Sequence, residues 1–399
     1  MFLKQPTVLV YRKVKEESRM KKAMIIGGSN GIGLAIALEL SQSCENVIVV
    51  DRVAPSIALP SNCSFCKANL LSGDFSFLSD YEDINTLVIT AGFGRVAAFD
   101  SITPAEITNS FKVNTIAAFQ IIHHYFERML HPEPFFCAVM GSIAGLVSSP
   151  LFALYGATKA ALCNGIESLN IELEQSGTSN RILNVSPGSI KGTRFNGGEN
   201  VLEMLSPLAK QIIEEMQERH TRYIPDYEPI FRGVIERYQA DAHQYGLDSY
   251  KYKMDGGRLS TRPQVKVGYL SGTFDLFHIG HLNLLRRAKE YCDYLVVGIH
   301  KDASHKGKQA FIPFEERADI VRNIKYVDEV ILSEPEDSDV YTKGIVKYDY
   351  LFVGSDYKGT ERFNRYEAYF ADKGVEIVYF PYTGETSSTQ LRDYLDNAK

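Results

Sequence analysis

Two segments of this chain place a glycine-rich turn between an apolar strand and a helix, and each has the pattern of a phosphate-binding loop. The first, "IIGGSNGIGLAIA", begins at residue 25, and the second, "SGTFDLFHIGH", covers residues 271–281. Glycines let the backbone approach a phosphate, and the unpaired N–H groups at a helix start favour an anion. With 399 residues the chain is long enough for two domains. We therefore expect two nucleotide-binding domains in tandem.

The fold class follows from short runs rich in Val, Ile and Phe that alternate with helical stretches in both halves of the chain. This alternation is typical of a parallel sheet covered by helices on both faces, which predicts two doubly wound, Rossmann-like α/β domains. A glycine pair, a polar stretch and Pro263 precede the strand that begins at Val265, and they mark the domain boundary. The predicted parts are an N-terminal extension (1–21), a first domain (22–258), a linker (259–264) and a second domain (265–399).

The composition of the chain limits the kinds of partner that it is expected to bind. The net charge of -6 and the pI of about 5.9 argue against a nucleic-acid partner. No apolar run approaches the roughly 20 residues that span a bilayer, and we identify no signal peptide. The six cysteines are scattered, as expected of reduced cytoplasmic thiols. Cys63 and Cys66 form a lone CxxC without further ligands at a suitable spacing, so we expect no protein-bound metal there. We therefore expect a cytoplasmic protein that acts on small molecules, without nucleic-acid or membrane partners.

The first glycine turn has the features of a dinucleotide site. Gly27, Gly31 and Gly33 stand where the strand turns into the helix, and Asp51 ends the next strand, about 20 residues further on. A carboxylate there accepts hydrogen bonds from an adenosine ribose and repels a 2′-phosphate, which favours NAD(H) over NADP(H). Arg52 keeps NADP(H) open as an alternative, because a guanidinium can accept that phosphate.

Further along the first domain, four polar side chains suit proton transfer. Tyr155 and Lys159 are four residues apart, so on a helix they share a face. A nearby ammonium favours the phenolate and is expected to lower the pKa of the tyrosine. Ser142, at the end of a strand, is placed to hydrogen-bond a substrate carbonyl, and Asn114 would complete a polar relay.

On these motifs, residues 22–257 resemble the short-chain dehydrogenase/reductase family. The resemblance implies hydride transfer between NAD(H) and a carbonyl or alcohol, with Tyr155 as the acid/base and Lys159 also holding the nicotinamide ribose. It further implies that "MDGG" at 254–257 closes the fold and that the start of 194–253 forms a lid. The cofactor-binding residues that it implies are Gly27, Ser29, Asn30, Gly31, Ile32, Gly33, Asp51, Ala91, Gly92, Pro187, Gly188, Ile190 and Thr193.

One departure from that family concerns the fourth strand. The usual Asn-Asn-Ala-Gly is "ITAG" in this chain, so Ile89 and Thr90 replace two amides. These positions support the cofactor and do not react.

The second glycine turn carries two histidines. A helix is expected to begin near Ile279 or Gly280, which places His278 and His281 beside the positive end of its dipole. Imidazoles there can donate to phosphate oxygens and stabilise the charge that develops during nucleotidyl transfer. The alternative, a metal held by the two histidines, lacks a nearby carboxylate or cysteine on the helix, so Mg²⁺ carried by the nucleotide is favoured.

This GTFDxxHxGH pattern resembles the HxGH nucleotidyltransferases, and residues 265–396 resemble the glycerol-3-phosphate cytidylyltransferases. The resemblance implies that His278 and His281 bind and activate CTP, that Lys306, Lys308 and Arg317 neutralise phosphate charge, and that 387–389 cap a helix at phosphate. The full set of implied nucleotide- and phosphate-binding residues is Gly272, Thr273, Phe274, Asp275, Lys306, Lys308, Arg317, Asp356, Ser387, Ser388 and Thr389.

Substrate choice is where the second domain departs from its family. Tyr382 stands where an Arg is expected to touch phosphate, and Lys325 replaces another Arg. Arg362 and Arg392 are candidates to compensate. The base also stays open, with ATP as the alternative to CTP.

The two chemistries together suggest consecutive steps. A keto-sugar phosphate such as ribulose 5-phosphate or dihydroxyacetone phosphate would be reduced to a polyol phosphate, and cytidylyl transfer would give a CDP-alditol such as CDP-glycerol or CDP-ribitol, a precursor for teichoic-acid-like or capsular polymers. Two alternatives are a reductase with an unrelated substrate and a first domain that only binds NAD or dimerises. We expect a homodimer or homotetramer.

Overall fold

The computed structural model describes residues 19–193, 195, 199–260, 265–302, 310–381 and 391. The chain divides into two compact units, one ending at Gln264 and the other beginning at Val265. Each unit contains its own parallel sheet, so the prediction of two doubly wound α/β domains is confirmed. Within the described ranges, no helix has the length and apolarity needed to cross a membrane.

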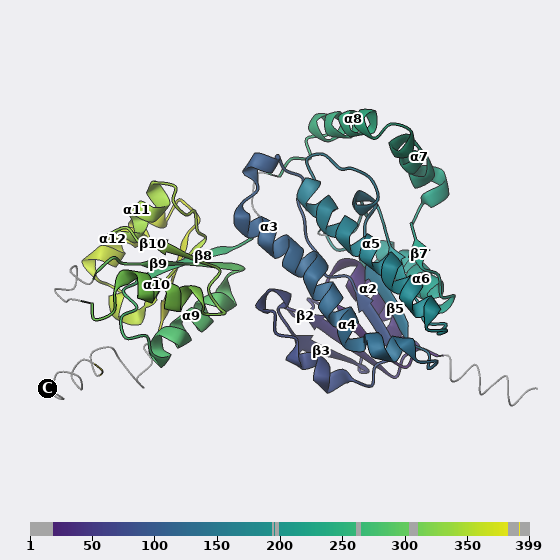
Figure 1. Cartoon of the computed structure of the whole chain (residues 1–399), viewed down its shortest axis with the longest axis horizontal. Helices are drawn as coiled ribbons and strands as arrows, with labels where there is room; N and C mark the ends of the chain where they lie inside the picture. Colours follow the sequence, from purple (N-terminus) through teal and green to yellow (C-terminus); the bar gives the residue numbers. More distant parts are fainter. Residues whose placement is uncertain are drawn as a thin grey trace, which may run out of the picture. The chain divides into compact units, whose positions relative to one another are not determined.

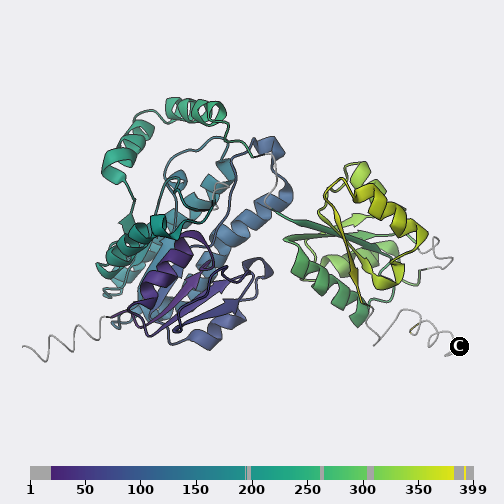
Figure 2. The ribbon, with the colours of Figure 1, turned by 180° about the vertical axis from the view of Figure 1, so that it is seen from behind.

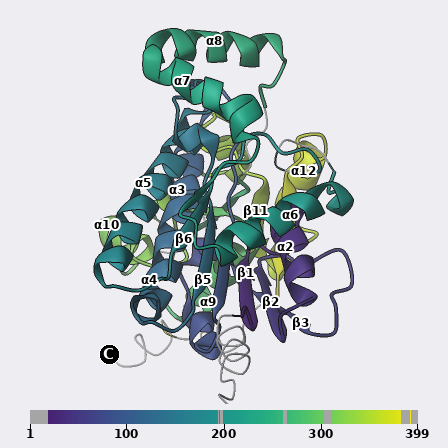
Figure 3. The ribbon, with the colours of Figure 1, turned by 90° about the vertical axis from the view of Figure 1, so that its right-hand side faces the viewer.

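The first unit is built on a sheet of seven described strands in the order β3-β2-β1-β4-β5-β6-β7. Its strands are mostly runs of buried Val, Ile, Leu and Phe, because both faces of a parallel sheet are covered. Figure 3 shows α4 and α5 to one side of these strands and α2 and α6 to the other. The strands are β1 (Lys22–Ile26), β2 (Asn46–Asp51), β3 (Cys63–Lys67), β4 (Thr86–Ile89), β5 (Phe136–Met140), β6 (Ile182–Val185) and β7 (Arg222–Tyr223). The helices are α2 (Gly31–Ser41), α3 (Pro104–Phe111), α4 (Ala117–Leu130), α5 (Ala153–Gln175), α6 (Leu202–Gln217), α7 (Arg232–Ala240) and α8 (Ala242–Asp255).

The first unit ends in two helices, α7 and α8. The last strand of its sheet is the two-residue β7, whereas the "MDGG" at 254–257 stands at the end of α8 and follows no strand. In Figure 1, α7 and α8 stand apart from the helices that cover the sheet. Lys253 fastens α8, because its ammonium donates to the hydroxyl of Ser149 and the carbonyl oxygen of Pro150, both at 2.8 Å. The "MDGG" segment thus follows the last helix of the first unit, and its role in closing the fold stays a prediction.

The second unit has five described strands in the order β10-β9-β8-β11-β12, all parallel. Figures 1 and 2 show α9 and α10 on one side of this sheet and α11 and α12 on the other. The strands are β8 (Val267–Gly272), β9 (Tyr294–Ile299), β10 (Glu329–Leu332), β11 (Tyr350–Gly354) and β12 (Glu376–Phe380). The helices are α9 (Ile279–Tyr291), α10 (Phe314–Arg322), α11 (Asp337–Thr342) and α12 (Glu361–Phe370).

Candidate functional site

The turn between β1 and α2 is closed by glycines and by one threonine. Gly27 has φ +83°, and a Cβ added to Gly33 would lie 2.4 Å from both the carbonyl oxygen of Gly27 and the Oγ1 of Thr90. The hydroxyl of Thr90 lies 3.1 Å from the carbonyl oxygens of Ile26 and Gly27, so it can donate to either. Thr90 thus fastens the turn at a position where the family pattern has an amide, a role that its residue type alone did not indicate.

Asp51 lies at the end of β2, beside this turn. Its carboxylate accepts the N–H of Ser29 at 3.2 Å and that of Arg52 at 2.7 Å. Ser29 is fully buried, and its hydroxyl oxygen has no hydrogen-bond partner among the described residues. Asn30 precedes α2, and its Oδ1 accepts the amide of Asn200 at 3.0 Å. An unsatisfied buried hydroxyl next to a glycine cradle fits a phosphate-bearing dinucleotide at this turn.

Asn114 lies in a π-helical turn, Lys112–Ile116, between α3 and α4, and it is completely buried. Its Oδ1 accepts the N–H of Phe93 at 3.0 Å. Its amide nitrogen donates to the carbonyl oxygen of Phe93 at 2.8 Å and to the hydroxyl of Thr158 at 3.1 Å. These bonds join the segment after β4 to α5, where Tyr155 and Lys159 lie.

Ser142, Tyr155 and Lys159 converge at the carboxyl ends of β4 and β5. Ser142 acts on the pKa of Tyr155 as a hydrogen-bonding neighbour, and the Nζ of Lys159 lies 5.7 Å from the centre of the Tyr155 ring. The ammonium of Lys159 donates to the carbonyl oxygen of Met140 at 2.7 Å. A Cβ on Gly92 would lie 3.2 Å from that Nζ and 3.3 Å from the Oδ1 of Asn114. The four side chains singled out in the sequence therefore surround one small space.

Burial shifts the pKa values of Tyr155 and Lys159. It raises the pKa of Tyr155 above its ordinary value, and the hydrogen bond with Ser142 opposes that rise. Burial also lowers the pKa of Lys159 to about 8. The expected lowering of the Tyr155 pKa by Lys159 is not observed, because removal from water dominates for the phenol and the ammonium bonds a backbone carbonyl. A phenol that keeps its proton suits proton donation to a carbonyl oxygen.

The loop after β6 brings the remaining predicted cofactor residues toward the same edge of the sheet. The carbonyl oxygen of Pro187 accepts the N–H of Ile143, next to Ser142, at 3.1 Å. The methyl carbon of Thr193 lies 3.8 Å from a Cβ placed on Gly31. Gly188 and Ile190 lie between Pro187 and Thr193 in this loop. A Cβ on Gly188 would lie 2.3 Å from Cζ of Phe231, which covers the loop and which no sequence motif had indicated.

In the second unit, His278 and His281 stack at the start of α9, with ring centres 4.0 Å apart and planes at 29°. The Nδ1 of His278 accepts the N–H of Gly280 at 3.0 Å. Burial lowers the pKa of His278. The neutral ring with an accepting Nδ1 carries its proton on Nε2, which is the form that donates to a phosphate oxygen.

Two predicted phosphate-site residues have other partners in the structure. Arg317 is buried, and it donates to the carbonyl oxygens of Ile312 at 2.9 Å, His300 at 3.0 Å and Lys301 at 2.8 Å, and to that of Thr273. Four of its five N–H groups are therefore engaged by backbone carbonyl groups, and the expected contact of Arg317 with phosphate stays a prediction.

Asp275 is also buried, and its two oxygens accept the N–H groups of Phe311 and Ile312, each at 3.0 Å. Like Arg317, it braces the loop that leads to the histidines. Phe274, with φ 51°, packs in the same loop, and Gly272 lies beneath its ring. A left-handed non-glycine residue is strained, so the surrounding contacts hold this loop in shape.

Asp356 lies beyond β11, with its Oδ1 2.4 Å from a Cβ placed on Gly354. The other predicted positions, Lys306, Lys308, Tyr382, Ser387, Ser388, Thr389 and Arg392, lie outside the described residues.

Comparisons with known proteins match the two units to two different families. The family model described as short chain dehydrogenase matches residues 21–201, and the one described as cytidylyltransferase-like matches 269–393. An uncharacterized oxidoreductase of Saccharomyces cerevisiae is 27% identical over 247 residues, 56% of this chain and 80% of that protein. A glycerol-3-phosphate cytidylyltransferase of Bacillus subtilis is 39% identical over 127 residues, 31% of this chain and 91% of that protein. A FAD synthase of Pyrococcus abyssi is 33% identical over 124 residues, 30% of this chain and 82% of that protein.

Both units are enzyme domains, an oxidoreductase and a nucleotidyltransferase. The chain belongs to the short-chain dehydrogenases through its first unit and to the cytidylyltransferase-like family through its second.

Proposed function

We propose that the second unit transfers the cytidylyl group of CTP to a polyol phosphate. The observation that carries this proposal is the histidine pair at the start of α9, because His278 and His281 can donate to phosphate oxygens beside the positive end of a helix dipole. The acceptor phosphate attacks the α-phosphorus, the bond to the β-phosphate breaks, and pyrophosphate leaves. We expect Mg²⁺ to arrive with the nucleotide.

The relatives support particular substrates for this step. The Bacillus subtilis protein is a glycerol-3-phosphate cytidylyltransferase, which favours CTP with glycerol 3-phosphate or ribitol 5-phosphate. The product would be a CDP-alditol. The FAD synthase among the relatives supports ATP as the second candidate, because FAD contains an adenylyl group.

For the first unit we propose the reduction of a keto-sugar phosphate to the polyol phosphate. Tyr155 donates the proton to the carbonyl oxygen, Ser142 hydrogen-bonds that oxygen, and Lys159 with Asn114 orients the site. NADH, held at the glycine turn and by Asp51, supplies the hydride when bound. Asp51 favours NAD(H) over NADP(H), since its carboxylate repels a 2′-phosphate.

The two proposed steps are consecutive, since the alcohol made in the first is the acceptor of the second. Such activated polyols would serve teichoic-acid-like or capsular polymers, and the enzyme would work in the cytoplasm as a homodimer or homotetramer. The second candidate for the first unit is a module that binds NAD or dimerises without reducing this substrate.

A pyrophosphate-release assay tests the transferase. We expect release with CTP and a polyol phosphate, little with ATP, UTP or GTP, and loss of at least about a hundredfold in His281→Ala, since one lost charge-stabilising donor costs roughly that much. Arg286→Ala, on the exposed side of α9, is the matched control and should keep full activity. Release in none of the combinations, or an unimpaired His281→Ala, would refute the proposal.

A further inference from the structure

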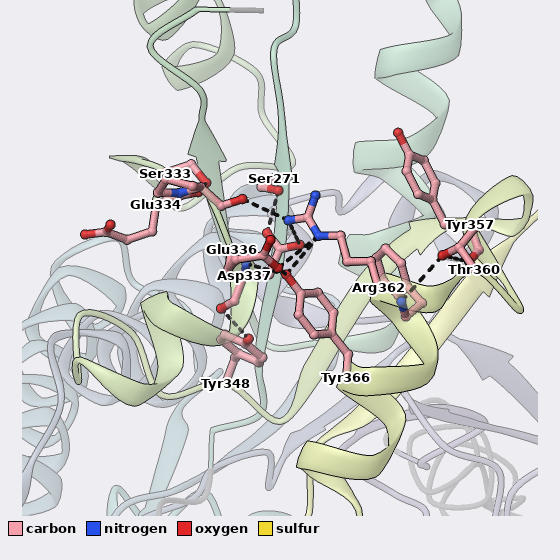
Figure 4. A network of polar contacts seen from close by, with 12 residues as sticks. Ser271, Ser333, Glu334, Glu336, Asp337, Tyr348, Tyr357, Thr360, Arg362 and Tyr366 are labelled. Carbon is pink, nitrogen blue, oxygen red and sulfur yellow. Dashed lines mark hydrogen bonds and ion pairs between the residues drawn. The ribbon is translucent and has the colours of Figure 1, made fainter. Parts of the chain in front are cut away.

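A polar network, drawn in Figure 4, lies at the carboxyl end of β8 in the second unit's sheet. Ser271 stands near the end of β8, and its hydroxyl donates to Oδ1 of Asp337 at 2.6 Å. Asp337, the first residue of α11, is 5% exposed. Because Ser271 comes two residues before Thr273, this bond fixes the strand end from which the histidine loop departs.

Arg362 joins the network from the first turn of α12. Its Nη2 lies 3.5 Å from Oδ2 of Asp337 and donates to the carbonyl oxygen of Pro335 at 3.0 Å. Its Nε lies 3.2 Å from Oε2 of Glu336 and donates to the hydroxyl of Tyr366 at 3.0 Å. Two of the three guanidinium nitrogens are thus engaged. The hydrogen bonds and ion pairs that Arg362 makes with the described residues use Nε and Nη2, and none of them uses the third nitrogen, Nη1.

Two tyrosines hold the carboxylates in place. The hydroxyl of Tyr366 donates to Glu336 and accepts the N–H of Asp337 at 2.9 Å. The hydroxyl of Tyr348 donates to the carbonyl oxygen of Asp337 at 2.9 Å. These bonds fix the positions of the Arg362 guanidinium and of the Glu336 carboxylate, with the Nε of the guanidinium facing Glu336.

The strand order places this network where a ligand is expected. In the order β10-β9-β8-β11-β12, strands β9 and β10 follow on one side of β8, and the later strands β11 and β12 lie on its other side. The boundary between β8 and β11 is therefore the topological switch point of the sheet. Open α/β sheets bind ligands outside the carboxyl ends of the strands at that point. The histidines lie on the α9 side of the edge, and the network lies on the α11 and α12 side. If the histidines hold the triphosphate, the network borders the space left for the acceptor.

The charges of the network decide which part of an acceptor it suits. One guanidinium faces two carboxylates, so the local charge does not favour a phosphate dianion. Hydroxyl groups, in contrast, both accept and donate. The Nη1 of Arg362 can donate to one hydroxyl group of a polyol, and the carboxylate of Glu336 can accept from another. Both side chains are accessible, since Arg362 is 29% and Glu336 40% exposed. We propose that Arg362 and Glu336 bind the hydroxyl groups of the acceptor, with Asp337 and Tyr366 as positioning residues. This inference rests on the proposed transferase function.

Steady-state kinetics of pyrophosphate release in the full chain tests the assignment. Loss of a charge-assisted hydrogen bond should raise the KM for glycerol 3-phosphate or ribitol 5-phosphate by about tenfold or more in Arg362→Met and in Glu336→Gln, while the KM for CTP stays unchanged. With 3-hydroxypropyl phosphate, which lacks one hydroxyl of glycerol 3-phosphate, the effect of either substitution should shrink. Arg365→Met, exposed on the same helix, is the matched control.

The outcomes separate the inference from the function on which it rests. A wild-type protein without activity on any polyol phosphate refutes the proposed function itself. An active wild type whose Arg362→Met and Glu336→Gln variants keep the acceptor KM refutes the inference alone. Equal increases in the KM for CTP and for the acceptor, repeated in Arg362→Lys, also overturn it, because the network would then only support the fold of the unit.

Discussion

Tyr155 is the residue on which the proposed reduction depends. Its ring stacks on Phe152 with centres 4.4 Å apart, so Tyr155→Phe keeps the packing and removes only the hydroxyl. Since general acid catalysis contributes about 10²–10⁴ in rate, we expect NADH consumption with a keto-sugar phosphate to fall at least about a hundredfold. Pyrophosphate release by the same protein serves as the internal control. Unchanged NADH consumption would leave the first unit as a binding module.

Lys159 gives the reductase a pH dependence. Its pKa falls from the ordinary 10.5 to about 8 in the folded protein, so the ammonium that orients the site is lost as pH rises through about 8. We expect NADH consumption at saturating substrate to fall in that range. Between the folded-state pKa of about 8 and the ordinary 10.5, Lys159 is neutral in the folded protein and protonated in the unfolded chain. Its titration therefore raises the free energy of unfolding as pH rises, so unfolding caused by Lys159 cannot explain the loss of NADH consumption.

Two variants identify the group that titrates. The pKa of Lys253 is also lowered to about 8, and the midpoint should persist in Lys253→Met. In Lys159→Arg the charge stays, so the remaining activity should lose its midpoint. A wild-type profile that is flat through this range would contradict the assignment.

Single residues also show why the sites were predictable only in part. Tyr155 and Lys159 are recognisable in the sequence because two residues four apart on one helix share a face whatever surrounds them. The carbonyl partners of Arg317 could not be predicted from its residue type, because only the folded chain brings the carbonyl groups of Thr273, His300 and Lys301 around it.

At the scale of elements, the turn between β1 and α2 depends on a close approach at Gly33. A Cβ there would lie 2.4 Å from Gly27 O, so we expect Gly33→Ala to lower the free energy of unfolding of the first unit by about 2 kcal/mol. Binding of NADH, followed by fluorescence titration, should weaken at the same time. Gly233→Ala is the matched control, since nothing lies within 4 Å of its added Cβ in α7. A helical Gly→Ala change there should stabilise by about 0.5–1 kcal/mol, and equal behaviour of the two variants would contradict the argument.

The elements that the sequence indicated well are the buried ones. The central strands of both sheets are continuous apolar runs, which is the pattern from which the alternation of strands and helices was predicted. The edge strands β3 and β7 were not predicted. β3 contains Ser64 and ends in Lys67, and β7 has only two residues, so neither forms an apolar run, and their place comes from pairing with a neighbour.

At the scale of the whole molecule, the proposed intermediate must leave one unit and reach the other. Tyr155→Phe should still perform cytidylyl transfer and His281→Ala should still reduce, but neither should make a CDP-alditol from keto-sugar phosphate, NADH and CTP. An equimolar mixture of the two variants should restore the product, because the polyol phosphate released by one protein is the acceptor for the other. Chromatography of the nucleotide products measures this. Two active half reactions whose mixture yields no CDP-alditol would mean that the units act on unrelated substrates, and the consecutive order would fail while both assigned chemistries stood.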